Sequence, residues 1–185
     1  MKKVFYFLMA MMIVTLFMTA CNDDDEPEVK NVKLGAQENT AIDGFYSVSE
    51  NKTYTMDEGF QNQGAIDIFC FYEAENGNNI ALASPGSNIT GIFTGASSVE
   101  NWTTLNTTRF SSTTLTVAQF DALEETDQLI VNSYDTANNF RKAKDMAIDD
   151  IYAFKTQVET YGLLKVTDVA QGSDGSVEFE VKVKK

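Results

Sequence analysis

The 185-residue chain contains no histidine, only two cysteines and only two prolines. Without histidine there is no Ser-His-Asp triad, no Cys-His pair and no histidine-ligated zinc. Two cysteines are too few for a Cys₄ zinc site or a disulfide-dense scaffold. Basic residues are also scarce, with 14 Lys and Arg against 27 Asp and Glu and a formal charge of −13. This imbalance argues against nucleic-acid binding, which needs a basic face.

The chain is nevertheless apolar enough to fold, with 43% hydrophobic and 11% aromatic residues. Its first segment has the parts of a secretory signal peptide, which we assign to residues 1–20. Lys2 and Lys3 precede the apolar run 4–18, and small residues stand before Cys21. The run is shorter than the ~20 residues that span a bilayer, so cleavage is favoured over an uncleaved membrane anchor.

Met18-Thr19-Ala20-Cys21 resembles the lipobox of bacterial lipoproteins, with Met18 where Leu is usual. The resemblance implies that Cys21 becomes the lipidated first residue of the mature chain. Two acyl chains there would anchor the protein stably to a membrane. A lipidated Cys21 would be unable to form a disulfide with Cys70.

Residues 21–30 then form an acidic tether, because a block of like charges stays solvated. The cluster after Cys21 is similar to the surface-export signal of Bacteroidota lipoproteins. That resemblance implies an outer-membrane protein that faces the extracellular side. A plain spacer, with the protein on the inner leaflet, is the alternative.

Residues 31–185 are expected to form a single globular β-rich domain. Alternating apolar residues and turn signals predict eight strands, over residues 31–36, 45–49, 53–56, 65–73, 80–83, 151–156, 161–170 and 177–183. Thr116 is expected to cap a short helix. Residues 127–138 favour a second helix, although 129–131 is equally compatible with a strand. The predicted fold class is α+β, a mainly antiparallel β domain with one or two short helices.

Two of these strands give specific expectations about burial. Segment 65–73 is apolar on both faces, which predicts a central strand covered on both sides, with Cys70 as a buried small hydrophobe. In segment 177–183 the apolar side chains share one face. Ser176, Glu178, Glu180 and Lys182 are expected on a second face open to solvent.

Several short runs, spread over most of residues 32–183, resemble small surface-exposed lipoproteins of Bacteroidota. The runs are residues 82–85, Trp102, residues 108–110, 150–156 and 161–166. The resemblance implies location and fold. The group has no settled activity, so it implies no site.

Trp102, the only tryptophan, lies with Asn101 in a polar stretch of the long segment 85–106. An exposed indole with an amide beside it would form a sugar-binding platform. The alternative, which we favour, is that Trp102 plugs the loop onto the core, because large aromatic residues are usually buried.

The remaining candidates are weaker. Asp149-Asp150 and Glu124-Glu125 with Asp127 offer carboxylates for glycoside hydrolysis or calcium binding, but neither run matches a calcium loop, and solvated turns are favoured. Asp135-Thr136-Ala137 is similar to the O-glycosylation acceptor of Bacteroidota, with Thr136 as the modified residue. We identify no catalytic residue, no metal site, no nucleotide cradle and no other cofactor site in the sequence.

These observations predict a non-enzymatic surface lipoprotein that binds something outside the cell, with an extracellular glycan as the leading ligand. One alternative is a structural or adhesive envelope protein that assembles with membrane partners. A second is a carboxylate-dependent hydrolase.

Overall fold

The computed structural model describes residues 30–74, 77 and 79–185. The predicted signal peptide, Cys21 and the tether up to residue 29 lie outside these residues. Lys30, expected at the end of the tether, is instead the first residue of strand β1 (Lys30–Gly35). None of the helices in the described ranges has the length and apolar character needed to cross a membrane.

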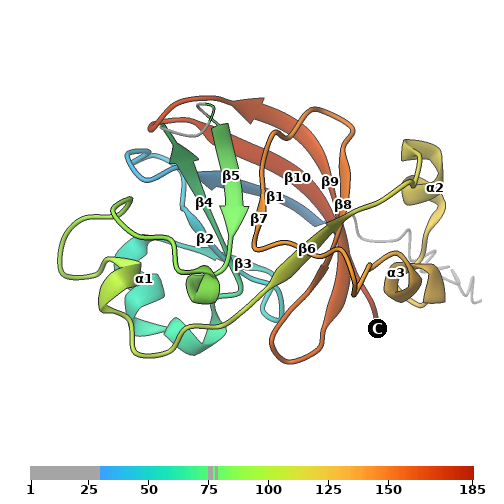
Figure 1. Cartoon of the computed structure of the whole chain (residues 1–185), viewed down its shortest axis with the longest axis horizontal. Helices are drawn as coiled ribbons and strands as arrows, with labels where there is room; N and C mark the ends of the chain where they lie inside the picture. Colours follow the sequence, from blue (N-terminus) through green and yellow to red (C-terminus); the bar gives the residue numbers. More distant parts are fainter. Residues whose placement is uncertain (1–29, 75–76, 78) are drawn as a thin grey trace, which may run out of the picture.

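The domain consists of two antiparallel sheets of five strands each, which face one another in Figure 1. The first has the order β1, β10 (Ser176–Val183), β9 (Tyr161–Ala170), β8 (Ile151–Lys155) and β6 (Arg109–Ser112). The second has the order β3 (Lys52–Tyr54), β2 (Phe45–Ser47), β4 (Ile68–Glu73), β5 (Asn79–Ala83) and β7 (Lys142–Ala143). The predicted class, mainly antiparallel β with short helices, is confirmed. The division into two sheets was not predicted.

The main core lies between the sheets and is built from alternate residues of both, such as Leu34 and Phe179 from one and Ile68 and Leu82 from the other. Strand β4 is central in its sheet and is covered on both faces, as predicted. Cys70 on β4 is fully buried and unpaired.

A second cluster covers the outer face of β4 and contains Phe69, Phe71 and Trp102. Ile66 also belongs to this cluster, although strict alternation along 65–73 would put its side chain on the same face as that of Cys70. The reason is that a 3₁₀ turn, η1 (Gln63–Ala65), occupies the predicted start of the strand, so the alternation begins only at Ile68.

Three short α-helices complete the domain: α1 (Met56–Gln61), α2 (Val117–Ala122) and α3 (Gln128–Asn132). Thr116 caps α2 as predicted, since its hydroxyl accepts from the backbone N–H of Gln119 at 3.3 Å. In return, the Gln119 side-chain oxygen accepts from the backbone N–H of Thr116 at 2.9 Å. Helix α1 begins where a strand was expected to end, because Thr55 and Glu58 form a capping box. Helix α3 ends six residues before the predicted limit of 138.

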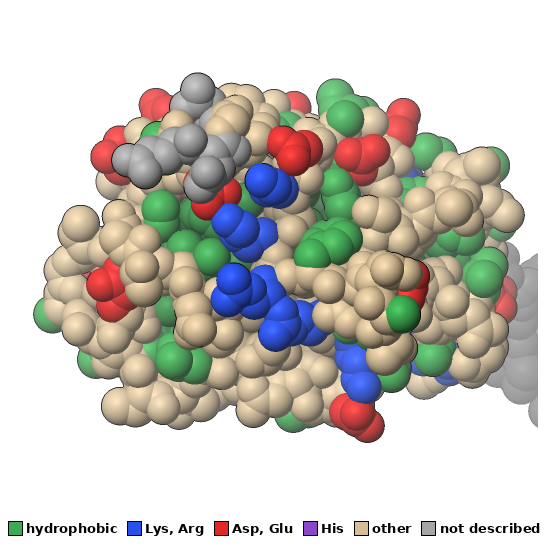
Figure 2. Space-filling view, viewed as in Figure 1, with side chains coloured by type: hydrophobic (Ala, Val, Ile, Leu, Met, Phe, Trp, Pro, Cys, Tyr) green, Lys and Arg blue, Asp and Glu red, His purple; other side chains and the backbone are tan. Residues whose placement is uncertain are grey.

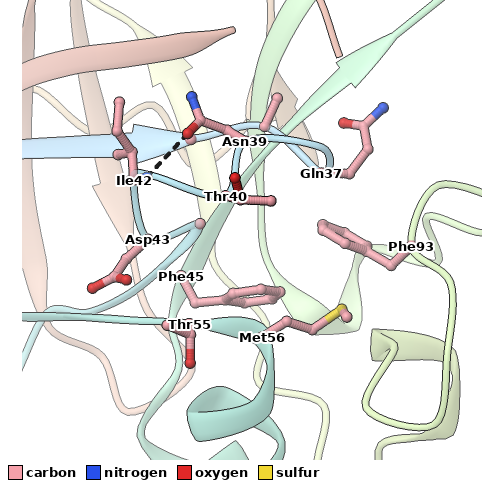
Figure 3. Close-up of a pocket in the computed structure, with 12 residues that line it drawn as sticks. Gln37, Asn39, Thr40, Ile42, Asp43, Phe45, Thr55, Met56 and Phe93 are labelled. Atoms are coloured by element: carbon pink, nitrogen blue, oxygen red, sulfur yellow. Dashed lines mark hydrogen bonds between the residues drawn. The ribbon is translucent and has the colours of Figure 1, made fainter. Parts of the chain in front are cut away.

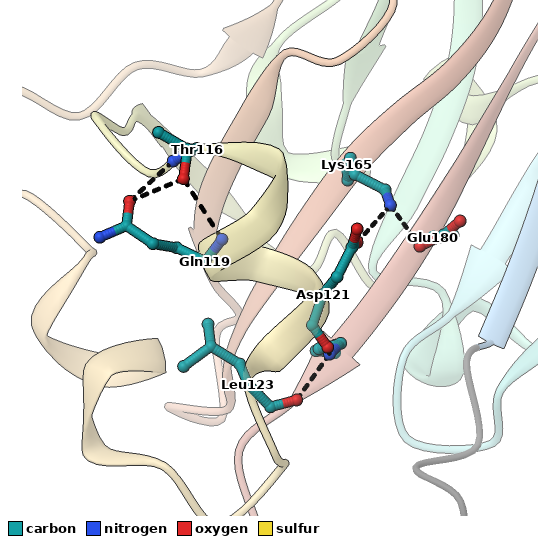
Figure 4. A network of polar contacts seen from close by, with 7 residues as sticks. Thr116, Gln119, Asp121, Leu123, Lys165 and Glu180 are labelled. Carbon is teal, nitrogen blue, oxygen red and sulfur yellow. Dashed lines mark hydrogen bonds and ion pairs between the residues drawn. The ribbon is translucent and has the colours of Figure 1, made fainter.

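The solvent face predicted for β10 is wrong at Ser176, which is 6% exposed, and at Lys182, which is only 3% exposed. Helix α2 lies over this face (Figure 4). Lys182 Nζ donates to the carbonyl oxygens of Leu123 at 2.5 Å and Asp121 at 2.9 Å. Its Nζ also lies 5.1 Å from the centre of the Phe120 ring. A lysine stem packs like an apolar side chain while its ammonium binds the carbonyls that end a helix. Strand alternation alone therefore gave the wrong burial.

Lys165 on β9 stands beside Lys182 beneath the same helix and is 7% exposed. Its Nζ lies 2.6 Å from Asp121 Oδ1 and 2.8 Å from Glu180 Oε2 (Figure 4). Burial alone would lower the pKa of Lys165, but the two carboxylates outweigh it and the pKa is raised. The two lysines thus fasten α2 to the first sheet.

Candidate functional site

Trp102 is buried, with 5% of its surface exposed. Its indole Nε1 donates to the Ser97 carbonyl at 2.9 Å, and its ring lies 5.4 Å from that of Phe45. A Cβ atom added at Gly59 of α1 would lie 3.2 Å from the indole, so the helix packs directly against the ring. Trp102 therefore holds the segment 85–106 to the core, as favoured from the sequence, and offers no open ring face for a sugar.

Asn101 is exposed, but its amide is used within its own loop. Its Nδ2 donates to the carbonyl oxygens of Gly95 at 3.1 Å and Ala96 at 3.2 Å, and to Ser98 Oγ at 3.0 Å. This side chain shapes the loop that carries Trp102. A ligand would have to compete with three contacts for the same amide.

A groove with a different lining lies nearby, where two hollows share Gln37, Met56 and Phe93. The smaller has a volume of about 210 Å³ and lies between the β1–β2 connection and the start of α1. The larger has a volume of about 670 Å³ and extends along the end of β4 to Thr90. Because the hollows share three residues, they lie side by side, and we call the two together the Phe93 groove.

The base of the Phe93 groove is aromatic. Phe93 is half-buried, and its ring centre lies 5.4 Å from that of Phe45 and 5.3 Å from that of Phe69. Figure 3 shows Phe45, Met56 and Phe93 around the hollow, with Gln37 and Thr40 from the β1–β2 connection across from them. A ring fixed by two other rings gives a rigid apolar surface on which a flat ligand can stack.

The rim of the groove is polar and held in shape by hydrogen bonds. Asn39 Nδ2 donates to the Asp174 carbonyl at 2.7 Å, and Asn39 Oδ1 accepts from the Ile42 N–H at 3.0 Å (Figure 3). Thr40 is exposed, and its hydroxyl makes no hydrogen bond among residues 30–74, 77 and 79–185. The groove therefore presents a free hydroxyl above an aromatic base.

The sequence alone did not reveal this groove, because its walls come from four segments that are distant in the chain, residues 35–45, 55–56, 72–74 and 90–94. Phe93 lies in the long segment 85–106, but the residue type that stands out there is the single tryptophan, Trp102. The only available signal was the length of that segment, since long ordered loops often carry function.

The two carboxylate runs found in the sequence, at 124–127 and 149–150, take structural roles. Glu125 binds Lys30 at 3.1 Å and Lys185 at 2.5 Å, while Asp127 Oδ2 accepts from the N–H of Glu124. Asp150 similarly accepts from a backbone N–H in the turn before β8. In the described part of the chain, no three His, Cys, Asp or Glu residues gather in a way that could hold a metal ion.

Thr136 lies in an exposed bend after α3 rather than in the predicted helix. Asp135 forms the bend, because its Oδ1 accepts from the N–H of Ala137 at 2.8 Å and of Asn138 at 3.1 Å. The hydroxyl of Thr136 therefore stands on an accessible turn. Its glycosylation stays a prediction.

The architecture is that of a two-sheet antiparallel β domain with a groove at one end of the second sheet. No protein-family model matches the chain, and no curated protein matches it. The fold is similar to that of a solved DUF4466 family protein from Parabacteroides merdae, a member of the Bacteroidota, with a TM-score of 0.57 and 14% identity. The match covers 84% of this chain and 52% of that one, so this chain spans about half of its length. The likeness shows the fold alone.

Proposed function

We propose that the protein is an outer-membrane lipoprotein that faces the extracellular side and binds a glycan in the Phe93 groove without catalysing a reaction. The groove is the observation that carries the proposal. Sugar rings present an apolar face and a polar edge, and the groove offers an aromatic base and a polar rim that match them.

The location rests on the N-terminal sequence. The short apolar run, the lipobox-like tetrapeptide ending at Cys21 and the acidic cluster that follows support lipid anchoring and export. A domain tethered by residues 21–29 would present its groove to material outside the cell.

Binding is favoured over hydrolysis because the carboxylates are engaged elsewhere. Glycoside hydrolases place two carboxyl groups on either side of the bond that breaks. Three carboxylates line the Phe93 groove. Glu73 forms an ion pair with Lys142 at 2.7 Å, Asp43 accepts from Thr53 Oγ1 at 2.9 Å, and Glu38 accepts from Ser173 Oγ.

An oligosaccharide array probed with the purified full-length protein in detergent tests the binding proposal. We expect capture of at least one glycan, and loss of that capture in Phe93→Ala. Phe60→Ala is the matched control, since Phe60 is also half-buried in the second cluster but lies outside the groove. Thr40→Trp provides a second variant, because it fills the hollow from an exposed position. Equal capture by parent, Phe93→Ala and Thr40→Trp would contradict the proposal.

The location is tested separately with Cys21→Ala. The parent should incorporate radiolabelled fatty acid and be cleaved by protease added to intact cells. The variant should incorporate none and leave the membrane fraction, or remain as an uncleaved precursor. Normal lipid incorporation by the variant would refute anchoring through Cys21.

A further inference from the structure

A row of five cations crosses the seam between the two sheets of this acidic protein. It comprises Lys155 on β8, Arg109 on β6, and Arg141, Lys142 and Lys144 in and beside β7. Figure 2 shows Lys and Arg side chains gathered in one line over β7 and β6. The row contains both arginines of the whole sequence, although the formal charge of the chain is −13.

The backbone register brings these side chains to one face. Lys155 lies directly opposite Arg109 in the antiparallel ladder of β8 and β6. On the other side of β6, Phe110 and Phe140 exchange two backbone hydrogen bonds of 3.0 and 2.8 Å. Phe110 is buried in the core and Phe140 packs against it. Arg109 alternates with the buried Phe110 and therefore points away from the core, and Arg141, its neighbour across the bridge, lies in an exposed bend.

Two of the five charges are compensated. Lys142 Nζ lies 2.7 Å from Glu73 Oε1, and Lys155 Nζ lies 2.7 Å from Glu159 Oε1. The Glu159 side chain is 76% exposed, so its pairing with Lys155 is open to exchange with a ligand.

Three charges are left without an acidic partner. Within the described ranges, Arg109, Arg141 and Lys144 form no ion pair. Arg141 is nevertheless held in position, since its Nη1 donates to the Ser87 carbonyl at 3.1 Å and Ser87 Oγ donates back to the Arg141 carbonyl at 3.2 Å. A fixed guanidinium loses less entropy when it binds a ligand than a mobile one.

We propose that this cationic row binds an acidic polysaccharide, whose carboxylate or sulfate groups contact Arg109 and Arg141. The planar guanidinium donates two parallel hydrogen bonds to such oxyanions. An extended polymer with repeated negative charges would lie along the row from Lys155 to Lys144. The row is separate from the Phe93 groove, shares none of its lining residues and does not depend on the proposed function.

A polysaccharide fits the row better than a nucleic acid. Duplex DNA carries one charge per ~1.7 Å and is bound by broad basic surfaces. Here three uncompensated cations stand in single file on a chain with 27 acidic residues. Acidic polysaccharides carry their charges farther apart, so a narrow row meets them with less repulsion from the surrounding carboxylates.

The test measures binding of the purified full-length protein to immobilised heparin, polygalacturonate, dextran and duplex DNA. The double variant Arg109→Gln/Arg141→Gln removes the two guanidinium groups. Its matched control, Lys33→Gln/Lys52→Gln, removes the same net charge from two exposed lysines elsewhere on the surface. Both variants are compared with the parent after circular dichroism has shown that they are folded.

We expect the parent to bind heparin, polygalacturonate or both, and not to bind the neutral polymer dextran. The affinity for the acidic polymers should fall as salt is raised from about 50 to 200 mM. The double variant should lose at least about tenfold in affinity, whereas the control should change by less than about twofold. Binding to heparin alone would identify sulfate as the anion, and binding to polygalacturonate alone would identify carboxylate.

Three results would overturn the proposal: a folded parent that binds neither acidic polymer, a double variant that binds like the parent, or tighter binding to DNA than to both polysaccharides. Failure of the Phe93 groove proposal can be distinguished from failure of this one. Thr40→Trp should leave heparin or polygalacturonate binding unchanged, and the double arginine variant should leave capture of neutral glycans on the array unchanged.

Discussion

Arg109 on β6 lies directly opposite Lys155 on β8, so two like charges face each other across an antiparallel ladder. Such a pair opposes folding, because like charges at directly opposed positions repel. Lys155 is relieved by its contact with Glu159, while Arg109 has no ion pair among residues 30–74, 77 and 79–185. An arrangement that costs stability and exposes charge is typical of a binding site rather than of a purely structural one.

Arg109→Gln should therefore stabilise the folded domain while it weakens binding to acidic polymers. Removing the repulsion from Lys155 should raise the free energy of unfolding by about 0.5 kcal/mol, within the usual range for cross-strand pairs. Urea denaturation at low salt measures this. Arg109→Lys, which keeps the charge, should not show the gain. A clear loss of stability in Arg109→Gln would contradict the account of this pair.

Trp102→Ala should destabilise the domain by roughly 3–5 kcal/mol, the range for deleting a buried large aromatic. The indole is 5% exposed and packs against Phe45 and Gly59. Trp102→Phe should cost less, because it keeps an aromatic ring and loses mainly the hydrogen bond to Ser97. If Trp102→Ala melts at the same temperature as the parent, Trp102 is not a core residue in solution.

Cys70 should react slowly with thiol reagents in the native protein and at once after denaturation. It is fully buried, and burial raises the pKa of its thiol far above the usual value, so almost none is present as reactive thiolate. Cys70→Ser should cost on the order of 1–3 kcal/mol if the new hydroxyl finds no partner. Cys70→Ala is the control, because it removes the sulfur without adding a hydroxyl and so measures the cost of the lost side-chain volume alone. Rapid stoichiometric labelling of the folded protein would refute the burial.

Glu125 joins the two ends of the described chain, since it binds both Lys30 and Lys185. Although burial raises its pKa, the hydrogen bonds and charges of the two lysines outweigh burial and hold the pKa below 4.5. The folded state therefore binds this proton less readily than the unfolded state. The stabilisation is complete above about pH 4.5 and is lost as the pH falls through the folded-state value.

Glu125→Gln should accordingly lower the free energy of unfolding by about 1 kcal/mol near neutral pH and by less at about pH 3. Chemical denaturation at a series of pH values measures the difference between variant and parent. Glu124→Gln is the control, because Glu124 is exposed and its side chain forms no ion pair in the described structure. A difference that does not change with pH would contradict the ion-pair explanation.

The sequence was informative where a pattern is local. Apolar residues on both faces of 65–73 predicted the central position of β4, and alternation predicted strands at 161–170 and 177–183, where β9 and β10 lie. Thr116 predicted the start of α2 because capping involves residues only three apart.

The sequence was not informative where contacts join distant segments. Alternation predicted that Lys182 faces solvent, but helix α2, from elsewhere in the chain, covers it. Strand β7 has only two residues, too few for any periodicity, although it places Lys142 in the cationic row. Arg109 and Arg141 become neighbours only through the bridge between Phe110 and Phe140. No local sequence pattern predicts that bridge.

The proposed glycan groove is tested most directly by NMR of methionine methyl groups. The described residues contain two methionines, Met56, which lines both hollows of the Phe93 groove, and Met146, which is buried in the core between the sheets. On titration with a glycan captured by the array, the Met56 methyl signal should shift in a saturable way while the Met146 signal stays in place. A bound glycan that leaves the Met56 signal unchanged would contradict binding in the groove.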